Sequence, residues 1–228
     1  DLVSTDLDGE IVLMSIERGN YYGLERTARR IWELLEAPVS LAALCAAWGR
    51  EYAAPAEVIE ADVRQNKIFL APGSVWDTKR WLMSGYVEVA RALLARGFAV
   101  ELVGSPQENA LCEEIATAVP GVTNSAGQTN LSGLVDLLST GRALVCNDSG
   151  AMHAAAAAGL PAVAIFGPTT LALGFRPWQN AATVVQRDLQ CRPCGKHGAK
   201  KCPLGTHDCM KSVTSGEVLS ALEALLPG

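Results

Sequence analysis

The sequence predicts an α/β fold, with a doubly wound domain over residues 66–228 and a smaller unit over residues 1–65. Two observations lead to this prediction. From residue 67 onward, apolar strand-length runs alternate with amphipathic helical segments, which is typical of a mostly parallel sheet with helical crossovers. The charge balance also changes near residue 65, from 12 acidic and 6 basic residues before it to 12 acidic and 13 basic residues after it. This asymmetry indicates two units.

The elements of the larger domain follow from its hydrophobic periodicity. We expect right-handed crossovers between its parallel strands. Strands are predicted at 67–71, 98–103, 143–146 and 162–166, with weaker ones near 121–124 and 182–186, and helices at 84–96, 108–118, 130–139, 151–158 and 215–226.

The smaller unit begins with a predicted β-hairpin. An apolar run at 10–16 is followed by the turn pair Gly19-Asn20 and then by Tyr21-Tyr22. Three helices are expected after it, because apolar residues recur at helical spacing and Pro38 and Pro55 mark boundaries. The third helix is short, and no linker separates it from the strand at 67–71.

Composition excludes several classes of protein. With 49% apolar and 19% charged residues, the chain suits a well-buried globular protein rather than a disordered one. It has no apolar run long enough to span a membrane and no visible secretion signal. Because the first residue is Asp1, the start is expected to be missing or processed. Neither half is basic enough to predict binding to nucleic acid.

Four loops follow predicted strands, where ligands of parallel α/β sheets bind, at 72–81, 104–108, 147–153 and 166–169. The third loop leads into an Ala-rich helix, whose first N–H groups suit a phosphate, and Gly150 allows close approach. Asp148 can accept hydrogen bonds from sugar hydroxyls, while Lys79 can neutralise a diphosphate. These loops together predict a sugar-diphosphate ligand. The alternatives are that Asp148 and Ser149 are ordinary helix caps, Lys79 a solvated charge and His153 a simple helix residue.

These motifs resemble the C-terminal half of family 9 glycosyltransferases, the lipopolysaccharide heptosyltransferases with a GT-B fold. The resemblance covers about 160 residues and is carried by Ala71-Pro72-Gly73-Ser74, Thr78-Lys79-Arg80-Trp81, Asn147-Asp148-Ser149-Gly150-Ala151-Met152-His153 and Ile165-Phe166-Gly167-Pro168-Thr169. It implies a Rossmann-like domain that binds ADP-heptose or a similar donor without a required cofactor. It also implies lipopolysaccharide biosynthesis in the cytoplasm, at the inner face of the membrane.

The resemblance also implies roles for individual residues. Lys79 would contact the diphosphate, Asp148 the donor sugar, and Ser149 and Gly150 the phosphates. Glu108 would bind the adenosine ribose, Ser74 would line the pocket, and His153 belongs to the same donor-binding set.

One departure from the family affects catalysis. Family members carry an N-terminal Rossmann domain that binds the acceptor and supplies the catalytic carboxylate, and residues 1–65 have neither its size nor its pattern. The catalytic residues therefore remain unassigned, and we expect an acceptor domain to act in trans. The alternatives are a non-catalytic scaffold that binds the nucleotide sugar, or an incomplete or chimeric chain, which the abrupt junction at Gln65-Asn66 favours.

Residues 1–65 resemble a different family, the PqqD family of peptide-binding chaperones. The resemblance rests on the runs at 8–13, 17–24 and 28–35. It implies a small winged-helix-like domain that recruits a peptide or protein partner by adding a strand to its hairpin. The alternative for Tyr21, Tyr22 and Trp32 is a place in the hydrophobic core, which is the preferred interpretation for Trp32.

Four of the seven cysteines, Cys191, Cys194, Cys202 and Cys209, cluster in a Gly/Pro/Lys-rich segment. The first pair has the spacing of zinc ligands, whereas the second pair is wider than in a usual zinc ribbon. The cluster is a candidate structural zinc site, and the alternatives are reduced or disulfide-linked cysteines. The other three, Cys45, Cys112 and Cys146, sit in apolar patterns and are expected to be buried.

Overall fold

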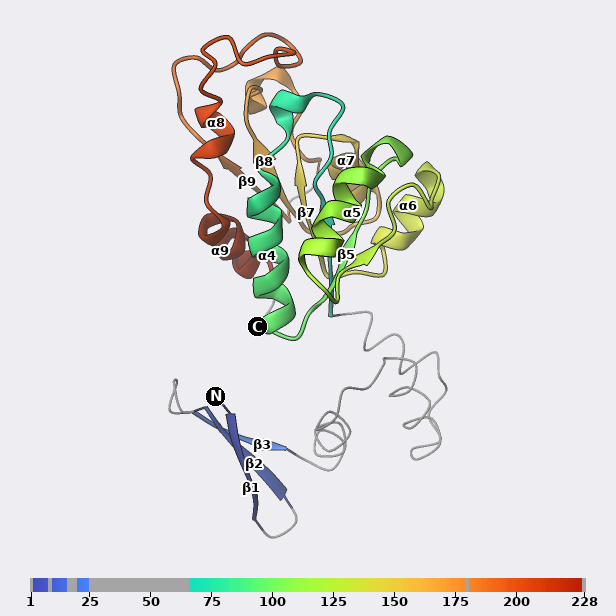
Figure 1. Cartoon of the computed structure of the whole chain (residues 1–228), viewed down its shortest axis with the longest axis vertical. Helices are drawn as coiled ribbons and strands as arrows, with labels where there is room; N and C mark the ends of the chain where they lie inside the picture. The colour runs from blue at the N-terminus through green and yellow to red at the C-terminus, as the bar shows by residue number, and fades with distance from the viewer. Residues whose placement is uncertain (1, 8–9, 16–19, 25–65, 179–180, 227–228) are drawn as a thin grey trace. The chain divides into compact units, whose positions relative to one another are not determined.

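The computed structural model describes residues 2–7, 10–15, 20–24, 66–178 and 181–226 (Figure 1). By its internal contacts the chain divides into two units, Asp1–Glu60 and Ala61–Gly228. None of the helices in these ranges is long and apolar enough to cross a membrane.

The first unit contains a three-stranded antiparallel sheet in the order β1-β2-β3. Its strands are β1 (Leu2–Leu7), β2 (Glu10–Ser15) and β3 (Asn20–Leu24). Pairing of β2 with β3 confirms the predicted hairpin, and β1 is an additional strand that the sequence analysis did not predict. The helices expected between residues 24 and 65, together with Trp32 and Cys45, lie outside the described residues.

The second unit is built on a six-stranded parallel sheet in the order β6-β5-β4-β7-β8-β9. The strands are β4 (Lys67–Ala71), β5 (Ala99–Leu102), β6 (Thr123–Asn124), β7 (Ala143–Asn147), β8 (Ala162–Phe166) and β9 (Ala182–Gln186). The predicted doubly wound sheet is confirmed, and its strand order is that of a Rossmann domain.

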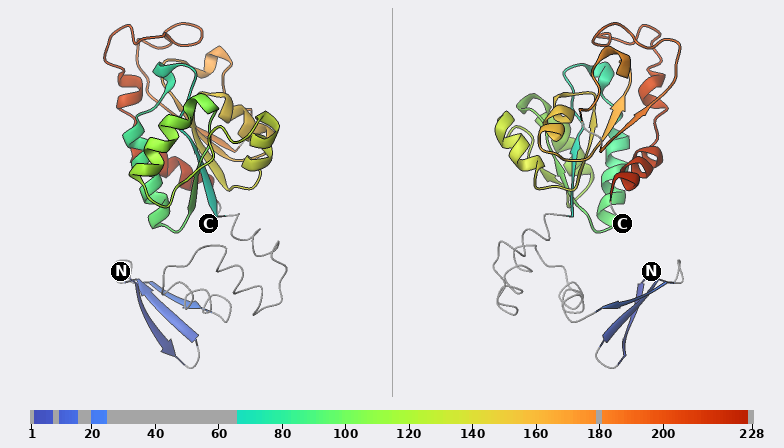
Figure 2. Two further views of the ribbon diagram at one scale, coloured as in Figure 1. Left: turned by 45° about the vertical axis from the view of Figure 1, so that its right-hand side comes forward. Right: turned by 180° about the vertical axis from the view of Figure 1, so that it is seen from behind.

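Helices cover both faces of this sheet (Figure 2). One face of the sheet shares a hydrophobic core with α4 (Met83–Ala95), α5 (Asn109–Ala118) and α9 (Ser215–Leu225). The other face shares a second core with α6 (Leu131–Leu138) and α7 (Gly150–Ala157). All five predicted helices are confirmed. Four shorter ones were not predicted: η1 (Asp77–Lys79), η2 (Pro106–Glu108), η3 (Leu171–Leu173) and α8 (Asp208–Lys211).

The two cores follow from the alternation of side chains along each strand. In β4, Ile68 and Leu70 face the core under α4 and α5, whereas Phe69 and Ala71 face the core under α6 and α7. All four are almost completely buried, which explains why this strand is a continuous apolar run.

Cys112 and Cys146 are fully buried as predicted. Burial raises the pKa of the Cys112 thiol to about 12, and it raises that of Cys146 as well. Both thiols therefore serve as small core residues.

The topology creates one position where ligands are expected. From β4 the chain proceeds to β5 and β6 on one side, and from β7 it proceeds to β8 and β9 on the other. Because β4 and β7 are neighbours, the loops after them begin side by side and then diverge, which opens a crevice at the carboxyl edge of the sheet.

Candidate functional site

A pocket of about 600 Å³ lies at this edge, a volume typical of small-molecule sites. Its walls come from the loops after β4, β5, β6 and β7 and from the segment around Phe175. All seven residues that the sequence analysis assigned to donor binding line it: Ser74, Lys79, Glu108, Asp148, Ser149, Gly150 and His153. Their proximity in space is a finding, while their individual roles stay predictions.

Asn147, at the end of β7, joins the two loops at the switch point. Its side-chain amide donates to the carbonyls of Pro72 (2.8 Å) and Gly73 (3.1 Å), and its Oδ1 accepts the N–H of Trp81 (3.0 Å). The residue is fully buried, so breaking these bonds would leave buried polar atoms without partners. Asn147 therefore holds the first loop in place rather than facing a ligand.

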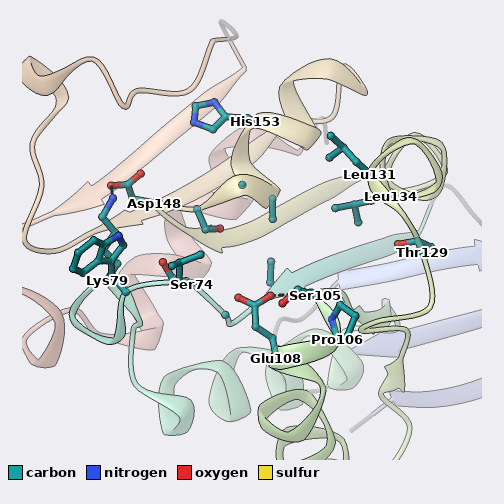
Figure 3. A pocket seen from close by; sticks show the side chains of 18 of the residues that line it. Ser74, Lys79, Ser105, Pro106, Glu108, Thr129, Leu131, Leu134, Asp148 and His153 are labelled. Atoms are coloured by element: carbon teal, nitrogen blue, oxygen red, sulfur yellow. Dashed lines mark hydrogen bonds and ion pairs between the residues drawn. The ribbon is translucent and has the colours of Figure 1, made fainter. Parts of the chain in front are cut away.

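Lys79 and Asp148 form an ion pair at one end of the pocket (Figure 3), with 2.6 Å between Nζ and Oδ2. Only 6% of Lys79 and 4% of Asp148 is exposed, so the interpretation of Lys79 as a solvated charge is wrong. The hydroxyl of the fully buried Thr169 donates to the same carboxylate oxygen at 2.5 Å. The Lys79 ammonium also lies 5.0 Å from the centre of the Phe175 ring.

The first turn of α7 borders the pocket next to this ion pair. Ser149 is the N-cap in an extended conformation, but its side chain makes no capping hydrogen bond. The interpretation of Asp148 as the helix cap is wrong, since that residue pairs with Lys79 instead. A Cβ atom added to Gly150 would meet nothing within 4 Å, so the start of the helix is open to a ligand.

Glu108 lies between the two ends of the pocket. Its carboxylate accepts the N–H of Ser105 at 2.7 Å, as part of a capping box at the start of η2. The backbone of Gly73 packs against this carboxyl group, and a Cβ atom there would come within 2.1 Å of Glu108 Cδ. Glycine at this position therefore allows Glu108 to point into the pocket.

The far end of the pocket is apolar and was missed by the sequence analysis. Leu131 and Leu134, from the start of α6, lie there together with Thr129 (Figure 3). Leu131 is 74% exposed, so its apolar side chain is accessible to a ligand at this end of the pocket. The sequence pattern that would mark this loop as following a strand was weak, because the strand before it, β6, has only two residues. Phe175 was also missed, since it follows no strand directly.

The pocket therefore combines a charged end, a central carboxylate and an apolar end. A cation, a helix N-terminus and a carboxylate suit phosphates and hydroxyls, whereas exposed leucine side chains suit a flat aromatic or apolar group. A nucleotide attached to a hydroxylated group has this distribution of chemistry.

The four late cysteines are all free thiols. Cys194, Cys202, Cys209 and His207 share a small cavity, but no group of three or more described His, Cys, Asp or Glu residues is arranged to hold a metal ion. The backbone N–H of His207 lowers the pKa of the Cys202 thiol, whereas burial raises that of Cys209. This arrangement gives no support to zinc binding.

The chain matches the model of glycosyltransferase family 9 (heptosyltransferase) over residues 28–204. It belongs to this family. The match begins inside the segment that resembles PqqD.

Individual relatives agree with the family assignment. The chain is 34% identical to lipooligosaccharide heptosyltransferase 2 of Haemophilus influenzae, covering 70% of this chain and 47% of that protein. It is 33% identical to lipopolysaccharide heptosyltransferase 2 of Escherichia coli K12, covering 70% and 46%. The chain thus spans about half the length of the curated relatives it matches.

Solved structures show the same fold. The ADP-heptose lipopolysaccharide heptosyltransferase II of E. coli matches with a TM-score of 0.61 and 28% identity, over 82% of this chain and 52% of that chain. The family 9 glycosyltransferase of Veillonella parvula matches with a TM-score of 0.63 and 20% identity, over 79% and 49%. The predicted half of a GT-B fold is therefore confirmed.

We expect the Lys79–Asp148 pair to be strongly coupled in stability. Lys79→Met or Asp148→Asn alone leaves one buried charge without its partner and should cost about 3–5 kcal/mol. The double variant should cost less than the sum of the two, by about 1 kcal/mol or more. Urea unfolding of the four proteins measures this coupling, and losses that add to within about 0.5 kcal/mol would show that the pair is not formed in solution.

Proposed function

We propose that the pocket binds a nucleotide-diphosphate sugar, ADP-heptose or a close analogue, as the donor of a glycosyl transfer. The observation that carries the proposal is the buried Lys79–Asp148 pair beside the open first turn of α7, at the switch point of a Rossmann sheet. The relative with a 28% identical solved structure is named for ADP-heptose, which supports the choice of nucleotide and sugar.

The chemistry of the pocket gives an orientation to the donor. The adenine lies at the apolar end with Leu131 and Leu134, and the ribose hydroxyls donate to Glu108. The diphosphate lies at the first turn of α7, at Ser149 and Gly150. There it replaces Asp148 as the ion-pair partner of Lys79. Asp148 then accepts hydrogen bonds from the sugar hydroxyls, with Ser74 and His153 completing the wall.

Transfer to an acceptor requires a base near the acceptor hydroxyl and close to the anomeric carbon of the donor. We propose that a second domain supplies the base and binds the acceptor, because the alignments cover only about half the length of the matched relatives. The alternative function is a non-catalytic protein that binds the nucleotide sugar. Turnover separates this alternative from a glycosyltransferase. If this chain alone released ADP from ADP-heptose in the presence of an acceptor, the non-catalytic alternative would be excluded.

For residues 1–65 we propose a PqqD-like unit that binds a peptide or protein partner. The described part of this unit is the sheet β1-β2-β3, in which β1 and β3 are the edge strands. An edge strand offers free backbone groups for an added strand. The partner would bring an acceptor, or the domain that carries it, to the donor site.

We also retain zinc binding at Cys191, Cys194, Cys202 and Cys209 as a hypothesis. Its support is the ligand-like spacing of the first cysteine pair in the sequence.

Substitution of Gly150 tests the donor site by steric blocking. A leucine there has open space and would extend into the pocket, so ADP affinity in calorimetric titration should fall at least about tenfold, or 1.4 kcal/mol. Stability should stay equal or rise by up to about 1 kcal/mol, since glycine disfavours helices. The matched control is Gly216→Leu in α9, where the added side chain is equally unhindered.

The wild-type chain and Asp148→Ala complete this test. Absence of ADP and ADP-sugar binding by the wild type would contradict the proposed donor site. Equal affinity of the wild type and Gly150→Leu would place the nucleotide elsewhere on the molecule. Asp148→Ala should weaken ADP-heptose more than ADP, because the proposed contact of Asp148 is with the sugar.

A peptide array tests the proposed role of residues 1–65. We expect the full chain to retain a subset of peptides with a shared extended motif, and scrambled versions of those peptides to be lost. Retention that depends only on peptide charge would argue against strand addition, because there the specificity comes from pockets for alternate side chains of the added strand.

Elemental analysis of the chain purified under reducing conditions tests the zinc hypothesis. A structural site would give about one zinc ion per chain, lost when Cys202 and Cys209 are changed to serine together. A metal content near zero, with all thiols titratable, would refute it.

A further inference from the structure

The cysteine-rich segment between β9 and α9 lines none of the donor pocket, yet it contacts the loop after β4, which lines the pocket, and the loop after β8, which carries Thr169. It is the orange and red segment at the top of Figure 1, at the carboxyl edge of the sheet. Its hydrogen bonds with those loops run through backbone carbonyls, and His197 also lies against the pocket residue Phe175, with 5.5 Å between the ring centres.

His207 makes the most direct of these contacts. Its Nε2 lies 2.7 Å from the carbonyl oxygen of Thr78, and because a carbonyl only accepts, this nitrogen carries the proton. Thr78 and Lys79 are consecutive residues of η1. The His207 ring therefore fixes the peptide group from which the Lys79 side chain starts.

The same turn is held a second time from this segment. The Thr78 hydroxyl donates to the carbonyl of Ala199 at 2.6 Å, and Thr78 is only 7% exposed. Backbone and side chain of Thr78 are thus both bonded to residues about 120 positions later in the chain. A turn of three residues has few internal hydrogen bonds, so these outside contacts set its orientation.

His207 is itself well anchored. Its backbone has a φ of 58°, a left-handed conformation uncommon for residues other than glycine, and its N–H donates to the Cys202 sulfur at 3.4 Å. A residue held in such a conformation by its surroundings is often one whose side chain must point in a set direction.

The segment is also fixed to the loop that carries Thr169, the hydroxyl donor to Asp148. The N–H of Cys194 donates to the Pro168 carbonyl at 2.8 Å, and the Arg192 guanidinium donates to the carbonyls of Gly167 and Thr169. Both members of the Lys79–Asp148 pair are therefore connected to one segment outside the pocket.

We infer that His207 is a positioning residue of the donor site, which orients Lys79 toward the diphosphate through the Thr78 carbonyl. This inference rests on the proposed function, because it assigns His207 a role in the same site. His207 touches no substrate. Its hydrogen bond matters most for the part of the ligand that Lys79 contacts, and least for the nucleoside at the opposite end of the pocket.

Two substitutions at residue 207 separate positioning from a general structural role. His207→Asn keeps a residue that tolerates positive φ but is too short to reach the Thr78 carbonyl. His207→Gln places an amide N–H near the position of the histidine Nε2 and can restore the bond. Lys201→Ala, at an exposed position of the same segment, is the control.

The measurement compares affinities for ADP and adenosine by competition against a fluorescent ADP analogue. His207→Asn should weaken ADP roughly three- to tenfold, the range of one lost hydrogen bond, and change adenosine by less than about twofold. His207→Gln should recover most of the ADP affinity. Thermal unfolding checks that each variant is folded.

The inference is overturned if His207→Asn binds ADP as the wild type does, or if ADP and adenosine weaken by the same factor. Failure of His207→Gln to recover ADP affinity also overturns it. A wild-type chain that binds neither ligand would instead refute the proposed function, and this inference with it, so the two failures are distinguishable.

Discussion

The amide of Asn147 is the constraint on which the site depends. β4 and β7 are adjacent parallel strands whose chains leave the sheet in opposite directions, so nothing in the sheet itself holds their loops together. The Asn147 side chain does so, by bonding to backbone groups of the loop at 72–81 on both its donor and its acceptor side. With that loop fixed, Lys79 comes within reach of Asp148, which directly follows Asn147.

The Lys79–Asp148 pair explains how a buried site can be both stable and ready for an anion. Each charge alone would be costly to bury, whereas here the Oδ2 atom of Asp148 accepts from both the Lys79 ammonium and the Thr169 hydroxyl. In the proposed complex, the diphosphate replaces Asp148 as the anionic partner of Lys79, and sugar hydroxyls replace the Lys79 ammonium at Asp148. The number of unpaired buried charges need not rise during this exchange, which lowers the cost of binding.

The sequence predicts much of this fold because its strands are continuous apolar runs and its helices have clear periodicity. It also predicts seven pocket residues, since each of them lies in or just after a loop that follows a strand. It does not predict that Lys79 and Asp148 pair with each other, or that Asn147 is structural, because these depend on tertiary distances. Leu131, Leu134 and Phe175 escape prediction for a similar reason: they follow a two-residue strand or no strand at all.

Every described residue that lines the pocket lies in the range from Ala71 to Phe175, within one Rossmann domain. Donor binding, as proposed, therefore uses side chains of this domain. Glycosyl transfer has a stricter requirement, since an acceptor hydroxyl and a base must reach the anomeric carbon from the open side of the pocket. The two steps thus depend on different parts of the protein. In this proposal the part of the chain that matches its relatives forms the donor pocket, and transfer depends on what lies opposite that pocket.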